Sequence, residues 1–178
     1  LKMTGGRFAD GRITGLYGKS SNVYGLGVNM TGGTLLRTEI ARNLLETSGT
    51  SHDGPAGVYM TGGLVDSCRI VSNTVSTSSS PRTHGGGLKI TGGTVKNTLI
   101  AWNTDYQRTA GVFATGGTLE NCTIIGTQPL CYCKGLVLED CTFDTSCDRC
   151  FEKSQVEGTI IGKVSSVEEP VYGEIRYK

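Results

Sequence analysis

The chain has 178 residues, enough for one domain with a continuous core, and its 17 basic and 16 acidic residues give a formal net charge of +1. No run of like charge marks a nucleic-acid-binding tail or a polybasic membrane patch, so no nucleic-acid partner is expected. No apolar stretch approaches the roughly 18 residues of a membrane-spanning helix, so no membrane span is expected. The 27 glycines and the lack of helical periodicity indicate a chain that turns often.

An internal repeat begins with the triplet Thr-Gly-Gly, which recurs at intervals of 27, 30, 30 and 24 residues. Each triplet follows a three-residue segment whose first and third residues are apolar, and this alternation predicts a short strand whose middle residue faces solvent. The middle residues are Lys2, Asn29, Tyr59, Lys89 and Phe113. The glycines predict a turn after each strand, because glycine adopts a positive φ without a steric penalty.

A second template follows the triplet: an apolar residue, two residues of any kind, a small residue, one residue of any kind and a further apolar residue. It occurs seven times, the last two without the triplet, beginning at Phe8, Leu35, Val65, Val95, Leu119, Leu138 and Val156. Because equivalent residues of stacked coils lie above one another, the small positions predict an interior ladder of Cys68, Thr98, Cys122, Cys141 and Thr159. A second ladder is predicted at a corner, where asparagine tolerates a left-handed backbone, from Asn43, Asn73 and Asn103.

These repeats predict an all-β fold, a right-handed parallel β-helix (solenoid) of about seven coils over residues 1–162, with residues 163–178 as a C-terminal strand, cap or linker. One coil cannot bury its apolar positions alone, whereas stacked coils share a core. Because the chain opens inside a repeat unit, we expect it to be a portion of a longer protein with an uncapped first coil.

The segments "GVYMTGGLVDSCRIVSN" and "GLKITGGTVKNTLIAWN" resemble the right-handed parallel β-helix repeats of bacterial surface and secreted proteins, such as autotransporter-like passengers and adhesins. The resemblance implies an extracellular or cell-surface location. Polysaccharide-degrading enzymes carry similar repeats, so the resemblance is specific for the fold and not for an activity.

Four of the seven cysteines lie outside the interior ladder, as a C-x-C and a C-x-x-C pair: Cys131, Cys133, Cys147 and Cys150. Two disulfides would link the last coils in an oxidising compartment. A four-thiolate zinc site would do the same in a reducing one, and free thiols are the third alternative. All three interpretations are structural, and no cofactor is expected.

The predicted outward positions carry no set of catalytic groups. A glycoside hydrolase needs two carboxyl groups within about 10 Å of each other, and Glu39 is the only carboxylate at these positions. Tyr59, Lys89 and Phe113 form a candidate sugar-stacking strip, an aromatic platform with a polar handle. His52 and His84, in successive loops, are a candidate metal or acid–base pair but are expected to be solvated.

We therefore expect a non-catalytic extracellular structural or adhesive module, including a fibre or filament subunit that assembles head to tail through its solenoid ends. The alternatives are a fragment of a polysaccharide lyase or hydrolase and a carbohydrate-binding module for surface glycans. Binding from the side is expected at the loops that leave the asparagine corner, residues 17–25, 44–56, 74–86, 104–110 and 127–134.

Overall fold

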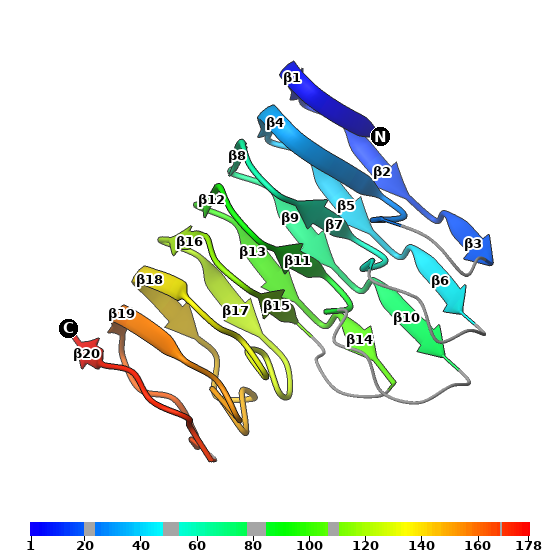
Figure 1. The fold of residues 1–178 in the computed structure, drawn as a ribbon. Coiled ribbons are helices and arrows are strands. Elements are labelled where there is room, and N and C mark those ends of the chain that lie inside the picture. The colour runs from blue at the N-terminus through cyan, green and yellow to red at the C-terminus, as the bar shows by residue number, and fades with distance from the viewer. Residues whose placement is uncertain (20–23, 48–53, 78–84, 107–110, 168) are drawn as a thin grey trace.

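The computed structural model describes residues 1–19, 24–47, 54–77, 85–106, 111–167 and 169–178. Within these residues the fold is all-β, without a helix, and forms a parallel β-solenoid whose strands stack side by side along one axis (Figure 1). The strands belong to a 16-stranded and a four-stranded sheet, and the four-stranded sheet marks about four turns of the solenoid.

Each turn contributes short strands at the same positions around the axis, so that equivalent strands of successive turns stack along it. The strands that precede or run through the triplet are β1 (Lys2–Ala9), β4 (Val28–Leu36), β7 (Val58–Met60), β11 (Leu88–Ile90) and β15 (Val112–Ala114). The strands that follow the triplet are β8 (Leu64–Asp66), β12 (Thr94–Lys96) and β16 (Thr118–Glu120), and β18 (Leu136–Phe143), which no triplet precedes, pairs with β16 in the next turn. The next position holds β2 (Arg12–Thr14), β5 (Glu39–Ala41), β9 (Arg69–Val71), β13 (Leu99–Ala101) and β17 (Thr123–Ile125).

The smaller sheet lies beyond a further corner and consists of β3 (Tyr17–Lys19), β6 (Leu44–Thr47), β10 (Thr74–Thr77) and β14 (Thr104–Asp105). The last two strands of the chain are β19 (Val156–Ile161) and β20 (Ile175–Tyr177), and β19 pairs with both β18 and β20.

The strand pairing confirms the alignment that the Thr-Gly-Gly repeat predicts. All strand pairs are parallel, and Lys89 lies opposite Tyr59 on one side and Phe113 on the other. The second glycine of each triplet has a positive φ, for example 91° at Gly63. A Cβ at Gly63 would lie 2.7 Å from the carbonyl oxygen of Gly33 in the preceding turn, so both the turn and the close stacking require glycine there.

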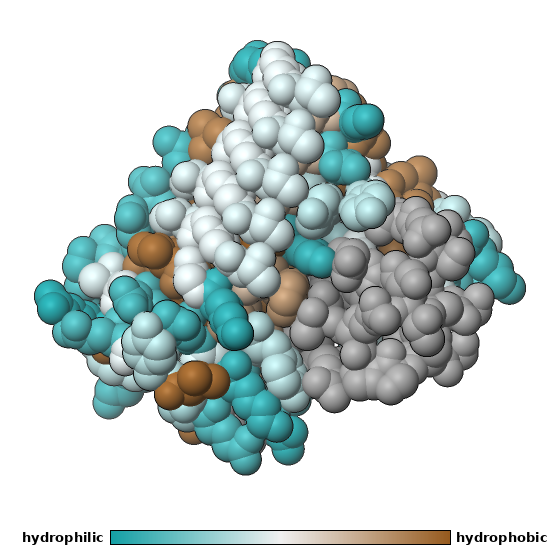
Figure 2. Space-filling model, viewed as in Figure 1, coloured by the Kyte–Doolittle hydropathy of each residue, from teal (hydrophilic) through white to brown (hydrophobic). Residues whose placement is uncertain are grey.

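The core is a continuous apolar column inside the solenoid. Its largest fully buried side chains are Met30, Leu35, Ile40, Met60, Ile70, Leu88, Ile90, Ile100, Leu119, Ile124 and Leu130, while Leu45 belongs to a separate small cluster with Ala56 and Val75. On the face seen in Figure 2, hydrophobic surface is confined to small patches separated by neutral and hydrophilic residues. Burial of the apolar positions inside a shared core is therefore the main source of stability.

The asparagine corner differs from the prediction in one respect. The left-handed residue is the one before each asparagine: Arg42, Ser72 and Trp102 have φ of 54°, 55° and 52°. The asparagines are therefore selected for what their side chains bind, and the residues before them make the turn.

Thr159 does not continue the interior ladder as predicted. A register shift between β18 and β19 places Ile160 opposite Cys141, and Thr159 is only half-buried. Gly158, with a φ of 133°, lies within this irregular stretch. The seventh match to the template is thus offset by the irregularity, which spacing alone does not reveal.

Candidate functional site

The predicted sugar-stacking residues come from three neighbouring strands, β7, β11 and β15, and lie together on the surface. The Lys89 ammonium nitrogen lies 5.7 Å from the ring centroid of Tyr59 and 5.5 Å from that of Phe113, within the range of cation–π attraction. Tyr24 packs against Tyr59 with 6.0 Å between ring centroids.

The side chains of this strip are less exposed than the alternation of residues predicts. Lys89 is only 9% exposed and Phe113 only 7%. The ring faces that turn toward Lys89 already hold its ammonium group, so a sugar would have to displace that group in order to stack there. The geometry identifies the strip as a packed surface contact between turns.

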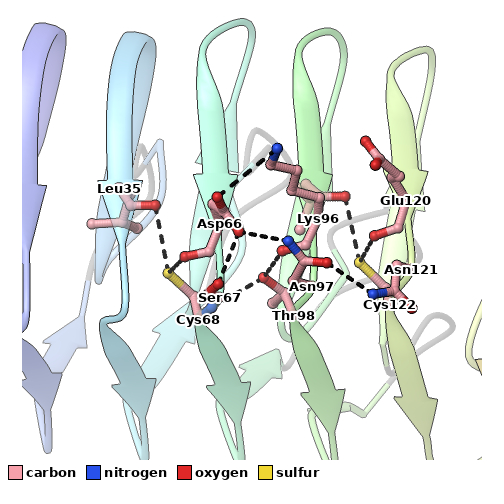
Figure 3. Close-up of polar contacts among 11 residues, drawn as sticks. Leu35, Asp66, Ser67, Cys68, Lys96, Asn97, Thr98, Glu120, Asn121 and Cys122 are labelled. Atoms are coloured by element: carbon pink, nitrogen blue, oxygen red, sulfur yellow. Dashed lines mark hydrogen bonds and ion pairs between the residues drawn. The ribbon is translucent and has the colours of Figure 1, made fainter.

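The interior ladder forms a column of hydrogen bonds at one corner of the solenoid, where Cys68, Thr98 and Cys122 lie at the same level of successive turns (Figure 3). The Cys68 backbone N–H donates to Thr98 Oγ1 at 3.2 Å, and the Thr98 hydroxyl donates to the Lys96 carbonyl at 2.7 Å. The thiols of Cys68 and Cys122 donate in the same way to the carbonyls of Asp66 and Glu120, at 3.2 and 3.4 Å. Cysteine and threonine are therefore equivalent at this position, because each supplies a small group that both accepts and donates a hydrogen bond.

Burial controls the acidity of these thiols. Burial raises the pKa of Cys68 above its usual value. A hydrogen bond to Cys141, together with burial, raises the pKa of Cys122. Both groups remain thiols, not thiolates, at neutral pH, which suits donors in a hydrogen-bonded core.

The outer side of the same corner carries a polar ladder (Figure 3). The Asn97 amide donates to Asp66 Oδ1 at 2.9 Å, and the Asn121 amide donates to Asn97 Oδ1 at 2.8 Å. The hydrogen bond from Asn97 and further contacts with Ser67 and Lys96 lower the pKa of Asp66. Asn97 and Asn121 have φ of 50° and 49°, so it is these exposed asparagines that use the left-handed backbone.

The buried asparagine ladder links three turns through both side chain and backbone. Asn43 donates to Asn73 Oδ1 from its backbone nitrogen at 3.2 Å and from Nδ2 at 2.9 Å. Asn73 donates to Asn103 Oδ1 in the same two ways, at 2.9 and 3.0 Å. The remaining amide hydrogen of Asn73 reaches the carbonyl of Ile40 at 2.9 Å. Each asparagine thus satisfies the backbone of the turn before it.

A further corner of the same kind is missing from the sequence-based prediction. Cys133 donates its backbone N–H to Ser154 Oγ at 2.9 Å, as Cys68 does to Thr98. Tyr132, directly before Cys133, and Lys153, directly before Ser154, have left-handed φ of 58° and 50°. The shared signal is a buried Cys, Ser or Thr directly after a left-handed residue, which no Thr-Gly-Gly triplet marks in this part of the chain.

The structure places all seven cysteines as buried free thiols. Within the residues that the structure describes, no group of three or more His, Cys, Asp or Glu side chains could hold a metal ion, so the four-thiolate zinc alternative has no ligand set there. Burial raises the pKa of Cys131 and Cys133 to about 12. The candidate histidines His52 and His84 lie outside the described residues.

The stacked parallel strands and hydrogen-bonded corners define a parallel β-solenoid repeat protein. No helix in the described segments has the length and apolarity needed to cross a membrane. The chain belongs to the family described as "Protein of unknown function (DUF3737)", whose model matches residues 88–178. No curated protein and no solved structure matches the chain.

Proposed function

We propose that the protein is a non-catalytic structural or adhesive module exposed outside the cell, which associates end to end through its strand edges. In this proposal residues 1–162 form a right-handed solenoid of about seven coils, and residues 163–178 cover its C-terminal end. The extracellular location rests on the resemblance of the repeats to those of bacterial surface β-helix proteins.

Strand pairing supports the coil count and the terminal cover. Parallel pairs continue from β16 to β18, from β18 to β19 and from β19 to β20, beyond the part where the four-stranded sheet marks the turns. Lys178 binds Asp140 at 2.7 Å, which ties the end of the chain to β18 at its left-handed residue.

The free edge of the first strands is the observation that carries the proposal. Among the residues that the structure describes, β1, β2 and β3 each pair with one other strand. Glu39, the partner of Arg12, donates its N–H back to Gly11, so by equivalence Arg12 directs its own N–H toward the free edge. Such an edge accepts another parallel strand, from further residues of the same protein or from a second molecule.

The outward charges pair within the solenoid, which also supports a structural role. Glu39 binds Arg12 at 2.8 Å, and Arg37 binds Asp10 at 2.6 Å. These pairs join neighbouring turns. Glu39, the only carboxylate at the predicted outward positions, is paired with a guanidinium, whereas a glycoside hydrolase needs two carboxyl groups near each other.

Sedimentation velocity over a range of concentrations, followed by negative-stain electron microscopy, tests the end-to-end association. We expect rods longer than one molecule, and fewer of them in Arg12→Pro, which removes the N–H at the free edge. Arg12→Ala is the matched control, because it removes the ion pair with Glu39 and keeps the N–H. Strictly monomeric particles at the highest concentration would refute the association, as would equal assembly of the two variants.

A further inference from the structure

Cys122 and Cys141 are the only two cysteines that lie next to each other in the interior ladder, among the residues that the structure describes. Thr123 pairs with Thr142, and the Thr142 N–H donates to the Cys122 carbonyl at 2.9 Å. Cys122, directly before β17, therefore lies opposite Cys141 in β18. Both thiols point into the same column, where Cys122 Sγ lies 3.4 Å from the Val95 carbonyl oxygen and Cys141 Sγ lies 3.2 Å from that of Leu119. The interaction between the two thiols raises the pKa of Cys122 and lowers that of Cys141. Adjacent strands are about 4.8 Å apart, within the roughly 4.4–6.8 Å between Cα atoms that a disulfide spans.

Cys147 and Cys150 form a second thiol pair in the connection after β18. Cys150 Sγ lies 3.5 Å from the Cys147 carbonyl oxygen. The interaction between the two thiols lowers the pKa of Cys147 and raises that of Cys150. Both side chains are fully buried. Arg149, with a left-handed φ of 48°, makes a turn in the chain between the two cysteines.

We propose that these are two disulfide sites, which close when the chain folds in an oxidising medium: Cys122 with Cys141, and Cys147 with Cys150. The oxidant is a small-molecule disulfide. One cysteine thiolate attacks its S–S bond, releases one small thiol and forms a mixed disulfide; the partner cysteine then attacks that bond and releases the second small thiol. Two cysteine S–H bonds are replaced by one S–S bond, and the two electrons and two protons pass to the two small thiols.

The other three cysteines remain thiols, for reasons that differ between positions. The neighbour of Cys68 on the next turn is Thr98, which offers no sulfur. The thiol of Cys131 contacts the Arg149 carbonyl at 3.7 Å, and that of Cys133 contacts the Val112 carbonyl at 3.6 Å. Burial raises the pKa of all three thiols, whereas each proposed pair contains one cysteine, Cys141 or Cys147, whose pKa is lowered by its partner and which supplies the attacking thiolate.

The pairing differs from a link between the C-x-C and C-x-x-C segments. Cys122–Cys141 joins two neighbouring turns, and Cys147–Cys150 closes a short loop within one connection. The inference concerns the chemistry of the folded chain and does not depend on the proposed end-to-end association.

Refolding of the denatured, reduced chain in a mixture of oxidised and reduced glutathione tests the proposal. After acid quenching and alkylation, peptide mapping by mass spectrometry without reductant is expected to show both bridges, with three of the seven cysteines alkylated. A chain in which all seven cysteines are alkylated, or a bridge that includes Cys131 or Cys133, would overturn it.

Serine variants separate the pairs. Cys141→Ser is expected to leave Cys122 alkylated and the Cys147–Cys150 bridge intact. Cys68→Ser is the matched control from the same ladder and is expected to leave both bridges unchanged. Serine suits these corners, because Ser154 already occupies one of them with the same hydrogen bonds. If alkylation in Cys141→Ser equals that in Cys68→Ser, the assignment of the first pair is wrong.

Discussion

Replacement of Asn73 by alanine removes the centre of the buried asparagine ladder. Asn73 is 0% exposed, and its Oδ1 is the acceptor for both the backbone N–H and one amide N–H of Asn43. In Asn73→Ala these two donors stay buried without that acceptor. A buried donor without a partner costs about 1–3 kcal/mol, so the free energy of unfolding is expected to fall by roughly 2–6 kcal/mol. This is a large share of the roughly 5–15 kcal/mol that holds a typical domain folded.

Urea unfolding followed by circular dichroism measures the loss, with the midpoint compared at constant slope so that the change reflects stability. Thr74→Ala is the control, since Thr74 follows Asn73 in the chain but lies half-buried on the outward side of β10. We expect this control to stay within about 0.5 kcal/mol of the wild type. A similarly small effect for Asn73→Ala would refute the view that the ladder satisfies the backbone of the preceding turn.

Two further predictions concern the small-residue corner and the C-terminal ion pair. Thr98→Val is expected to lower the free energy of unfolding by about 1–3 kcal/mol, because the Cys68 N–H loses its acceptor. Thr98→Cys is expected to lower it by less than about 1 kcal/mol. Equal losses for the two variants in urea unfolding would contradict the equivalence of cysteine and threonine at this position. Hydrogen bonds from Lys178 and Thr159 lower the pKa of Asp140 below its usual 3.8, so the stabilisation by Asp140 is present above that pH and is lost as the pH falls through the lowered value. Lys178→Ala is expected to return the Asp140 pKa toward 3.8, and an unchanged carboxyl titration by NMR would exclude the ion pair in solution.

The register of the solenoid was predictable because the repeat fixes it. Thr-Gly-Gly triplets 30 residues apart place Tyr59 beside Lys89, and the strands pair in that alignment. One residue of slip would turn every inward side chain outward, so a periodic apolar pattern admits a single register. The register in which these turns stack therefore follows from spacing and alternation.

The corners were harder to predict, because the residues that adopt a left-handed backbone share no chemical type. Arg42, Ser72 and Trp102 occupy equivalent corners with φ near 54°. What they share is the asparagine that follows, whose side chain binds the neighbouring turn. The offset of Thr159 likewise depends on the irregular pairing around Gly158, which interrupts the spacing without an obvious mark in the sequence.

Burial of Lys89 shows a second limit of sequence patterns. Alternation correctly places Lys89 on the outward side of β11, yet its side chain is only 9% exposed. The flanking rings of Tyr59 and Phe113 come from the turns before and after it, more than 20 residues away in the chain. The side of a strand to which a side chain points is set by the local sequence, whereas its exposed fraction depends on side chains from the neighbouring turns.

The corner ladders make the turns interchangeable units. The Asn73 side chain binds the turns directly before and after its own, and Val58 and Leu88 occupy the same position one period apart. A chain from which residues 58–87 were deleted would bring Asn43 opposite Asn103, with a carboxamide again facing a carboxamide. The number of turns can thus change by whole repeats during evolution while the contacts between neighbouring turns stay the same. The number of repeats can therefore vary independently of the sequence within each repeat.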